Sequence, residues 1–579
     1  MEARVVAKPT KRDSARNISF NFAGEKVLAK DGDSFASALT SAGIYDLKES
    51  LDGSRRGLYC GMGVCNECAI VVNGDSGKLA CMTSVCDGDE VSRQPAAAHV
   101  ATSSAVALPE LEIAPDLLVI GAGPAGLAAA AVSAEAGLRV LLIDERGKLG
   151  GQYFKQPADA FLDEGHLDAQ FREGRALIAR VKAAGVEILS GATIWGAFAP
   201  DHLVAASATS RWVLRPKNLV IATGAYEKGF QIPGWTLPGV MTTGAAQTLL
   251  RSYQVPLGSR VFISGNGPLN IQMAAELVRA GVKVEGLAEL SNPFRIKNAL
   301  TSLALAWYSP KLVFNGIGYF FTLAKAKVPI LLSQAVTRVS GEESIKQIEV
   351  KKIGSDGCTS SNSVKIFSID ALALGFGFMP SNEIARSLGC KHEFDQKSQT
   401  LQVVRDGYGR TSIKNVYVIG DSGGVAGAQV AKAVGVLAGY SILLGSSKTI
   451  SSQLLQEKKK ASRSYRRNVK FQSKLWKVFS GTISLDELNE PSTIICRCLS
   501  LSKSEISGQI SEELRTAGAL KRVSRAGMGI CQGRYCTSFV VSKTAENAGE
   551  IPSEYSGFAP QAPFKPTAIG IIAESVIQK

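Results

Sequence analysis

The stretch DLLVIGAGPAG, residues 116–126, sets the fold of the middle of this 579-residue chain. It predicts a strand over 116–120, a tight turn over 121–126 and a helix that begins inside the turn. A second strand is expected over 140–143, closed by two acids at 144 and 145. Glycines at the turn allow a pyrophosphate to approach the backbone, the helix N-terminus stabilises its charge, and an acid about 20 residues on can bind a ribose. The stretch therefore predicts a dinucleotide-binding α/β unit.

Three later segments indicate which nucleotide is bound. Gly151-Gln152 follows the second strand, Thr223-Gly224 ends a strand over 219–221, and Gly420-Asp421 follows a strand over 416–419. Together they resemble the pyridine nucleotide-disulfide oxidoreductase superfamily, in which the Asp of the Gly-Asp motif holds the ribityl chain of FAD. A simple strand-to-helix turn with an N-cap aspartate is the alternative for residues 420–421. The FAD-binding residues that the resemblance implies are Gly121, Gly123, Pro124, Ala125, Gly126, Asp144, Glu145, Gly151, Gln152, Thr223, Gly224, Gly420 and Asp421.

A second unit of the same type is nested inside the first. Strands are expected over 260–264 and 282–286, with the turn GNGPLN at 265–270 between them. Asn270 replaces the third glycine, and Glu289 is the nearest acid to the end of the second strand. We expect an intact fold here with weak or lost NAD(P)H binding, or another adenine nucleotide such as ATP in its place.

Four cysteines near the start of the chain have the spacing of a plant-type ferredoxin loop. Cys60, Cys65, Cys68 and Cys81 form the pattern Cys-x4-Cys-x2-Cys-x12-Cys, which wraps a [2Fe-2S] cluster. Before them, residues 17–30 alternate like a β-hairpin and Asp33-Ser34 caps an apolar helical run over 35–44. Zinc is the alternative metal, although structural zinc sites usually combine two Cys-x2-4-Cys pairs.

A second cysteine group lies near the end of the chain. Cys496, Cys498, Cys531 and Cys536 form Cys-x-Cys-x32-Cys-x4-Cys, and the block resembles the bacterioferritin-associated ferredoxin-like [2Fe-2S] domain. Ser502 and Glu505 fit a capping box at the start of a helix, and zinc again remains the rival metal. The basic residues near these ligands, expected to stabilise an anionic cluster, are Arg497, Arg522, Arg525 and Arg534.

Composition and charge argue against a nucleic-acid-binding protein, and the N-terminal residues argue against a signal peptide. A hydrophobic content of 45% and 58 glycines suit nucleotide-binding α/β layers. The net charge of +14 is scattered, and its one dense run, 458–467, is expected to be a solvated linker helix. We therefore expect no nucleic-acid binding, and assign the surplus charge to an acidic partner or a membrane surface. Residues 1–19 lack the apolar core of a signal peptide, which predicts a cytoplasmic protein.

The most apolar stretch, residues 300–332, is interrupted by Pro310, Lys311, Lys325 and Lys327. Its pieces are shorter than the roughly 18 to 20 residues that a transmembrane helix needs. We expect a partly exposed helix pair that covers a core or a subunit interface, and no transmembrane segment.

Two kinds of catalysis find no support. A redox disulfide beside the flavin is excluded because no cysteine lies between Cys86 and Cys358. No catalytic residue is assigned, since the histidines form no recognisable constellation. The histidines are His99, His166, His202 and His392, and the cysteines outside both groups, expected to be small packing side chains, are Cys86, Cys358 and Cys390.

The predicted fold class is α/β with three kinds of unit. A β-grasp ferredoxin-like domain spans 1–95. A stretch rich in Ala, Ser and Pro, 92–115, overlaps its end and is expected to be a linker. A discontinuous FAD-binding domain spans 114–232 and 366–450, and the second Rossmann-like domain, 233–365, is inserted into it. A helical [2Fe-2S] domain spans 485–579.

This order of units resembles the electron-transfer α subunit of heteromeric amino-acid and opine dehydrogenases, with a ferredoxin part fused at the N-terminus. The group includes octopine and nopaline oxidases, hydrogen cyanide synthase, dye-linked proline and hydroxyproline dehydrogenases, and the α subunit of sarcosine oxidase. The resemblance covers roughly residues 15–545, with anchors at 56–65, 80–83, 375–380 and 527–536. About 40 residues follow the last cysteine, so we expect no folate-binding domain like that of sarcosine oxidase and no sarcosine oxidase activity.

The resemblance implies a relay role. A partner flavoprotein β subunit of the glycine or sarcosine oxidase type would oxidise the C–N bond of an amino acid or opine. This chain, with FAD, two [2Fe-2S] clusters and an interface FMN, would pass the electrons to an acceptor such as a quinone at a membrane surface. Two alternatives remain: a self-contained NAD(P)H oxidoreductase, and an assembly scaffold whose FAD is structural.

Overall fold

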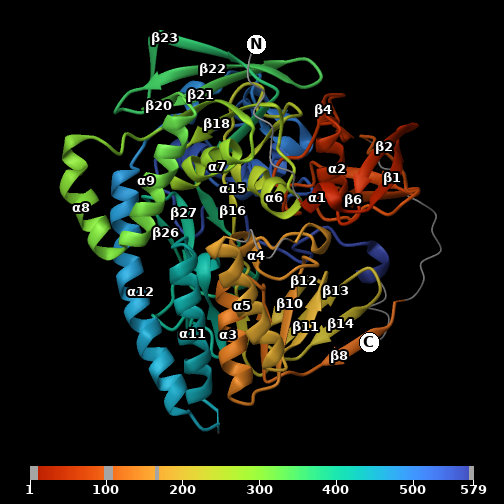
Figure 1. Cartoon of the computed structure of the whole chain (residues 1–579), viewed down its shortest axis with the longest axis vertical. Coiled ribbons are helices and arrows are strands. Elements are labelled where there is room, and N and C mark those ends of the chain that lie inside the picture. Colours follow the sequence, from red (N-terminus) through yellow and green to blue (C-terminus); the bar gives the residue numbers. More distant parts are fainter. Residues whose placement is uncertain (1–10, 97–107, 163–167, 447, 573–579) are drawn as a thin grey trace.

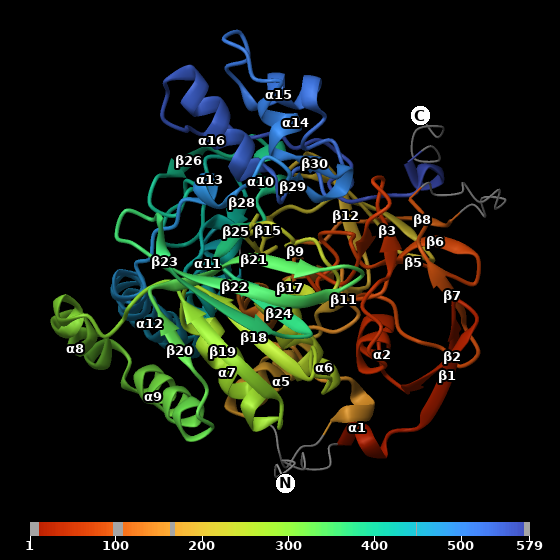
Figure 2. The same cartoon turned by 90° about the horizontal axis from the view of Figure 1, so that it is seen from above.

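The computed structural model describes residues 11–96, 108–162, 168–446 and 448–572, and it is mixed α/β, as predicted (Figure 1). His99 and His166 lie outside the described residues. The N-terminal and C-terminal units both lie against the central flavoprotein-like body, and Figure 2 shows the C-terminal helices above it and the N-terminal sheet at its side.

The N-terminal unit is a small mixed sheet with one helix across it. The predicted hairpin is present as β1 paired with β2, and Ser34 caps α2 in a capping box with Ser37. Phe20 and Phe35 meet edge to face in its core, with ring centroids 5.2 Å apart. The sheet order is β2-β1-β7-β5-β6. Its elements are α1 (Lys11–Ser14), β1 (Asn17–Phe22), β2 (Glu25–Lys30), α2 (Phe35–Ser41), β3 (Lys48–Glu49), β4 (Arg55–Arg56), β5 (Ala69–Val72), β6 (Asp75–Leu79) and β7 (Glu90–Arg93).

The first nucleotide-binding unit contains the predicted parallel sheet, in the order β11-β10-β9-β15-β28. The helix after the glycine turn, α3, packs against α11 on one face of this sheet. A smaller sheet, β12-β13-β14-β8, completes the unit. The elements are β9 (Leu117–Ile120), α3 (Pro124–Glu135), β10 (Val140–Asp144), α4 (Gly151–Phe154), α5 (Ala169–Ala183), β11 (Glu187–Ser190), β12 (Thr193–Ala199), β13 (His202–Ala206), β14 (Arg211–Leu214), β15 (Leu219–Ile221), β28 (Val416–Val418) and α11 (Ala428–Leu444).

The stretch expected to be a linker is not irregular throughout. Its last part forms β8 (Glu110–Ile113), which pairs in parallel with β14. β8 is an edge strand of only four residues, and three of these are exposed, two of them glutamates.

The second nucleotide-binding unit is a parallel sheet in the order β17-β24-β18-β19-β20, joined to an antiparallel sheet β21-β22-β23. The strand predicted over 282–286 continues to Glu289, because Gly286 leaves room for the Phe262 ring and does not end the strand. The elements are β17 (Val240–Thr242), α6 (Thr243–Tyr253), β18 (Arg260–Gly265), α7 (Pro268–Arg279), β19 (Lys283–Glu289), β20 (Ile330–Leu332), β21 (Gln334–Gly341), β22 (Ile345–Ile353), β23 (Thr359–Ser368) and β24 (Ala371–Gly375).

The apolar stretch forms the expected helix pair, α8 (Ala299–Tyr308) and α9 (Pro310–Lys325), at one edge of the molecule (Figure 2). Trp307 and Leu300 are 86% and 83% exposed. α8 packs on α12 (Ser452–Val478), the long helix that contains the basic run. In the part of the chain that is described, none of the helices combines the length and the apolar character of a membrane span.

The C-terminal unit is built from short elements around its cysteines. These are α13 (Leu485–Leu488), β29 (Ile494–Cys496), β30 (Leu501–Ser502), α14 (Lys503–Ser507), α15 (Ala517–Ser524) and α16 (Thr537–Ala548). Ser502 and Glu505 form the predicted capping box of α14. The chain then returns to the first nucleotide-binding unit, where Phe564 is buried in its core and donates its N–H to the carbonyl of Trp195.

Candidate functional site

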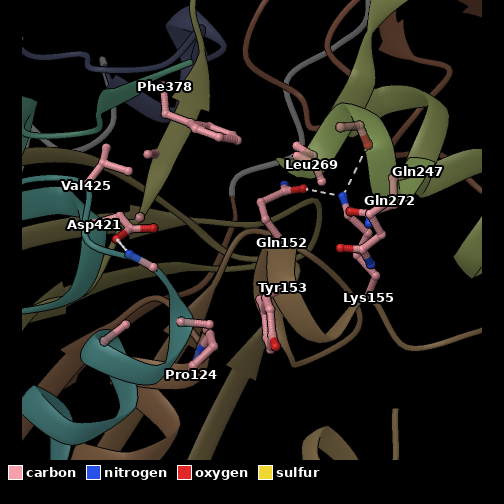
Figure 3. Close-up of a pocket in the computed structure, with 18 of the residues that line it drawn as sticks. Pro124, Gln152, Tyr153, Lys155, Gln247, Leu269, Gln272, Phe378, Asp421 and Val425 are labelled. Atoms are coloured by element: carbon pink, nitrogen blue, oxygen red, sulfur yellow. Dashed lines mark hydrogen bonds between the residues drawn. The ribbon is translucent and has the colours of Figure 1, made fainter. Parts of the chain in front are cut away.

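A cavity of about 1780 Å³ opens between the two nucleotide-binding units. Asp421 and Pro124 lie on one side of it, and Gln152, Lys155 and Gln272 lie on the other (Figure 3). Of the predicted FAD residues, those that line the cavity are Gly121, Gly123, Pro124, Ala125, Asp144, Glu145, Gly151, Gln152, Thr223, Gly224, Gly420 and Asp421. The structure therefore brings together segments that are up to 300 residues apart in the sequence.

Of the three glycines in the turn, Gly121 and Gly126 face protein and Gly123 faces the cavity. A Cβ atom added at Gly126 would lie 1.9 Å from the carbonyl oxygen of Gly121, so Gly126 is required for helix and strand to pack. A Cβ added at Gly123 would meet no protein atom within 4 Å. Gly123 precedes Pro124, the first residue of α3, so the open space lies at a helix N-terminus, where a pyrophosphate fits.

The two acids after β10 have different surroundings. Both carboxylate oxygens of Asp144 accept backbone hydrogen bonds, from Ala122 at 2.6 Å and from Arg146 at 2.8 Å. Glu145 instead pairs with Lys565 of the C-terminal segment at 2.9 Å, on the cavity wall. Asp144 therefore fixes the turn, while Glu145 is held on the cavity wall by a side-chain ion pair.

The other predicted motifs line the same cavity. Gly151 has a φ of +61° and approaches Gly123 so closely that an added Cβ would lie 2.7 Å from the Cα of Gly123. Gln152 accepts a hydrogen bond from Lys155. Thr223 donates its hydroxyl to the carbonyl of Ser381 at 2.6 Å, which ties the end of β15 to the strand region after β25 (Phe378–Pro380).

Asp421 is not the N-cap of α11. It lies in a 3-10 turn, Gly420–Gly423, and its Oδ1 accepts from the N–H groups of Ala426 and Gly427 at 2.9 and 3.1 Å. The cap of α11 is Gly427, which has no side chain to bond. Burial raises the pKa of Asp421, although these two N–H groups oppose the shift. A half-buried carboxylate on the cavity wall fits the polar chain of a bound FAD.

Two charged residues in the cavity wall were missed by the sequence analysis. Lys155 donates to Gln152, to the hydroxyl of Thr248 at 2.8 Å and to the carbonyl of Gly244 at 3.2 Å, and burial holds its pKa well below its usual value. Glu227 accepts from the N–H of Gly244 at 2.8 Å, and burial raises its pKa to about 7. Each lies three residues after a predicted motif, Lys155 after Gln152 and Glu227 after Gly224, and this proximity was the signal that could have found them.

The N-terminal cysteines are all buried and none forms a disulfide. They lie in two pairs, with Cys60 in hydrogen-bonding reach of Cys65, and Cys68 in reach of Cys81. Burial disfavours the Cys60 thiolate, yet hydrogen bonds from Cys65 and from backbone N–H groups bring its pKa to about 6. The backbone loop is thus already arranged to stabilise negative charge on sulfur.

The C-terminal cysteines show the same pairing, Cys496 with Cys536 and Cys498 with Cys531. The hydrogen bond from Cys536, against the effect of burial, lowers the pKa of Cys496 to about 7. Of the four arginines expected around these ligands, Arg497 and Arg534 are buried, while Arg522 and Arg525 are exposed.

Both cysteine groups fit a two-iron cluster. In [2Fe-2S] centres four thiolates serve two irons, two to each, whereas a structural zinc takes four ligands around one point. The two pairs at each site match the first arrangement. Across the described ranges, no set of three or more His, Cys, Asp or Glu side chains converges as ligands of a single ion.

The second nucleotide-binding turn differs from the first at its third glycine, as predicted. Asn270 is buried, donates to the carbonyl of Gly375 at 2.9 Å and accepts from Thr243 at 2.7 Å. Glu289, the nearest acid in the sequence, ends β19 and accepts from the N–H of Gly267 at 3.0 Å. Glu289 thus closes this turn as Asp144 closes the first, and burial raises its pKa to about 7.

Comparison with protein families agrees with this geometry. Residues 115–435 match the model described as pyridine nucleotide-disulphide oxidoreductase, more than half of the chain. The chain belongs to this family. Residues 15–96 match a 2Fe-2S iron-sulfur cluster binding domain, and residues 494–541 match a BFD-like [2Fe-2S] binding domain. The protein is therefore an oxidoreductase with a flavoprotein domain and two [2Fe-2S] domains, and the predicted fold class is confirmed.

Individual relatives confirm the predicted resemblance. An opine oxidase subunit of Agrobacterium tumefaciens is 30% identical over 79% of this chain and 91% of its own length. Hydrogen cyanide synthase subunit HcnB of Pseudomonas protegens is 27% identical over 78% of this chain and 95% of its own length. The crystal structure of L-proline dehydrogenase from P. horikoshii has a TM-score of 0.71, with 22% identity, and covers 98% of this chain and 99% of that one, so it shares the fold.

Proposed function

We propose that this chain is the electron-transfer subunit of a heteromeric dehydrogenase or oxidase that oxidises the C–N bond of an amino acid, an opine or a related secondary amine. The observation that carries the proposal is that Cys60, of the N-terminal cysteine group, lies on the wall of the same cavity as the FAD motifs. The family likeness to subunits of opine oxidase and hydrogen cyanide synthase supports it.

The flavin cavity and the N-terminal cysteine loop are also joined by a hydrogen bond. Arg146, which follows the Asp144-Glu145 pair, donates from Nη2 to the carbonyl of Gly61 at 3.0 Å. FAD supplies two-electron chemistry and a [2Fe-2S] cluster supplies one-electron chemistry. A cluster beside the cavity that holds the FAD motifs suits a protein that receives electrons in pairs and releases them one at a time.

The proposal predicts that the chain alone oxidises no amino acid. Dye-linked dehydrogenase activity should appear only when a substrate-oxidising flavoprotein subunit of the glycine or sarcosine oxidase type is added. The measurement is dye reduction with a panel of amino acids and opines, using the chain alone, the partner alone and both together. Equal activity of the chain with and without the partner would overturn the proposed relay role.

A self-contained NAD(P)H oxidoreductase is the second candidate, because Glu289 closes the second nucleotide-binding turn. We expect NADH and NADPH to reduce the flavin poorly, since the Asn270 side chain stands where that motif normally has no side chain. Stopped-flow mixing with either nucleotide, with flavin bleaching as the signal, tests this directly. Rapid bleaching without a partner would favour the self-contained reductase.

A further inference from the structure

The two cysteine loops meet through a residue that lies between ligands in each of them. Glu67 stands between Cys65 and Cys68 in the sequence, and Arg497 stands between Cys496 and Cys498. Glu67 Oε2 lies 3.2 Å from Arg497 Nε, across 430 residues of chain. Both side chains are buried, at 0% and 2% exposure. A buried ion pair in this place ties one ligand loop directly to the other.

Arg497 is held firmly by aromatic rings. Its guanidinium carbon lies 4.1 Å from the ring centre of Tyr59 and 4.6 Å from that of Trp235. Its Nη1 donates to the carbonyl of Trp235 at 2.9 Å. Planar stacking of this kind is specific to arginine and fixes the charge in one position.

Glu67 is surrounded by further cations of the N-terminal unit. Arg56 Nε lies 3.6 Å from Glu67 Oε2, and Lys48 Nζ lies 3.5 Å from Oε1. Arg56 also donates to the hydroxyl of Ser500, just beyond the Cys498 ligand, at 3.1 Å. The carboxylate is therefore compensated from both units, which a buried charge requires.

Aromatic residues next to the ligands form a second contact between the two cysteine loops. Tyr59 precedes Cys60 and Tyr535 precedes Cys536, and their rings meet edge to face with centroids 5.4 Å apart. Tyr535 is buried among the same side chains as Cys60 and Cys65 of the other unit. Cys60 and Cys65 of one ligand set and Cys531 of the other belong to one buried cluster of side chains, and Cys498 packs against it.

We propose that these contacts make the two [2Fe-2S] sites one electron-transfer junction, in which the Glu67–Arg497 pair and the Tyr59–Tyr535 contact hold the clusters near enough for direct exchange. This inference rests on the proposed function and states the order in which electrons pass between the two clusters. One electron leaves the N-terminal cluster, which borders the flavin cavity, and one enters the C-terminal cluster. The step needs no proton and no further reactant.

The first test measures both cluster potentials by EPR-monitored redox titration of the purified holoprotein. Arg497→Gln removes a buried cation, so both potentials should fall, because reduction adds negative charge to each cluster. Glu67→Gln removes a buried anion, so both should rise. A shift of one cluster alone, or shifts of the same sign in the two variants, would contradict the junction.

Two control variants separate charge from folding. Arg522→Gln removes an exposed arginine near the same ligands and should leave both potentials at the wild-type values. Arg497→Lys keeps the cation, so both potentials should stay much closer to the wild-type values than in Arg497→Gln. If the charge-removing variants lose iron, the second test decides the question on the wild-type protein.

The second test compares EPR spectra of fully reduced protein. Wild-type protein should show a magnetic interaction between its two clusters, and this interaction should be missing from Cys65→Ser and Cys536→Ser, which each keep one cluster. A wild-type spectrum equal to the sum of the two single-cluster spectra would overturn the proposal. Neither test uses a substrate or a partner protein, so failure here is distinct from failure of the proposed function.

Discussion

Replacing Gly123 by valine should empty the flavin site and leave the protein folded. The cavity side of Gly123 has no protein atom within 4 Å of an added Cβ, so the new side chain meets only the space expected for pyrophosphate. Loss of about 1.4 kcal/mol of binding already costs tenfold in affinity, and a valine in that space should cost more. We expect flavin content below about a tenth of wild type, measured by absorbance after denaturation.

The choice of glycine decides whether this experiment can be interpreted. Gly126 would be the wrong target, because its added Cβ would strike the carbonyl of Gly121 and disturb the fold itself. Gly147→Val is a matched control, since Gly147 is exposed in the same region and has no neighbour within 4 Å. Iron content should stay at the wild-type value in both variants. Full flavin content in Gly123→Val would mean that this turn does not bind FAD.

The cysteine variants have the second large effect. Wild-type protein should contain about four iron and about four acid-labile sulfide per chain, from two [2Fe-2S] clusters. Cys65→Ser and Cys536→Ser should each reduce both values to about two, because each removes one ligand of one site. Iron and sulfide assays with parallel zinc analysis provide the measurement.

A third cysteine serves as the control for handling and oxidation. Cys86 is exposed and lies outside both groups, so Cys86→Ser should keep all the iron. Stoichiometric zinc without labile sulfide would reject the two-cluster assignment, and loss confined to one variant would show which site was assigned wrongly.

The sequence predicted the units well, because each depends on local spacing. Strand, glycine turn and helix follow one another within about 20 residues in each nucleotide-binding unit, and each cysteine loop has a fixed pattern. Strand ends were less certain. The strand after the second turn runs to Glu289, three residues beyond the predicted end, since a glycine inside a sheet does not stop it when an aromatic ring fills the space.

Roles that depend on contacts between distant segments could not be predicted. Asp144 and Glu145 are adjacent and chemically similar, yet Asp144 accepts from the backbone N–H groups of Ala122 and Arg146 whereas Glu145 pairs with Lys565. The Glu67–Arg497 pair joins residues 430 positions apart, and although each lies inside a cysteine motif, neither motif specifies that they meet. These contacts form only when distant segments pack together, so the spacing of residues along the chain does not predict them.

The position of the segment around Phe564 has a consequence for how the protein is made and handled. Phe564 is buried against the first nucleotide-binding unit, and Lys565 pairs with Glu145 on the wall of the flavin cavity. The ribosome makes these two residues after every other part of that wall, so the cavity is complete only once they have been added. Removing residues from 558 onward for a shorter expression product should therefore yield a protein that loses flavin during purification, whereas an N-terminal affinity tag leaves that wall intact.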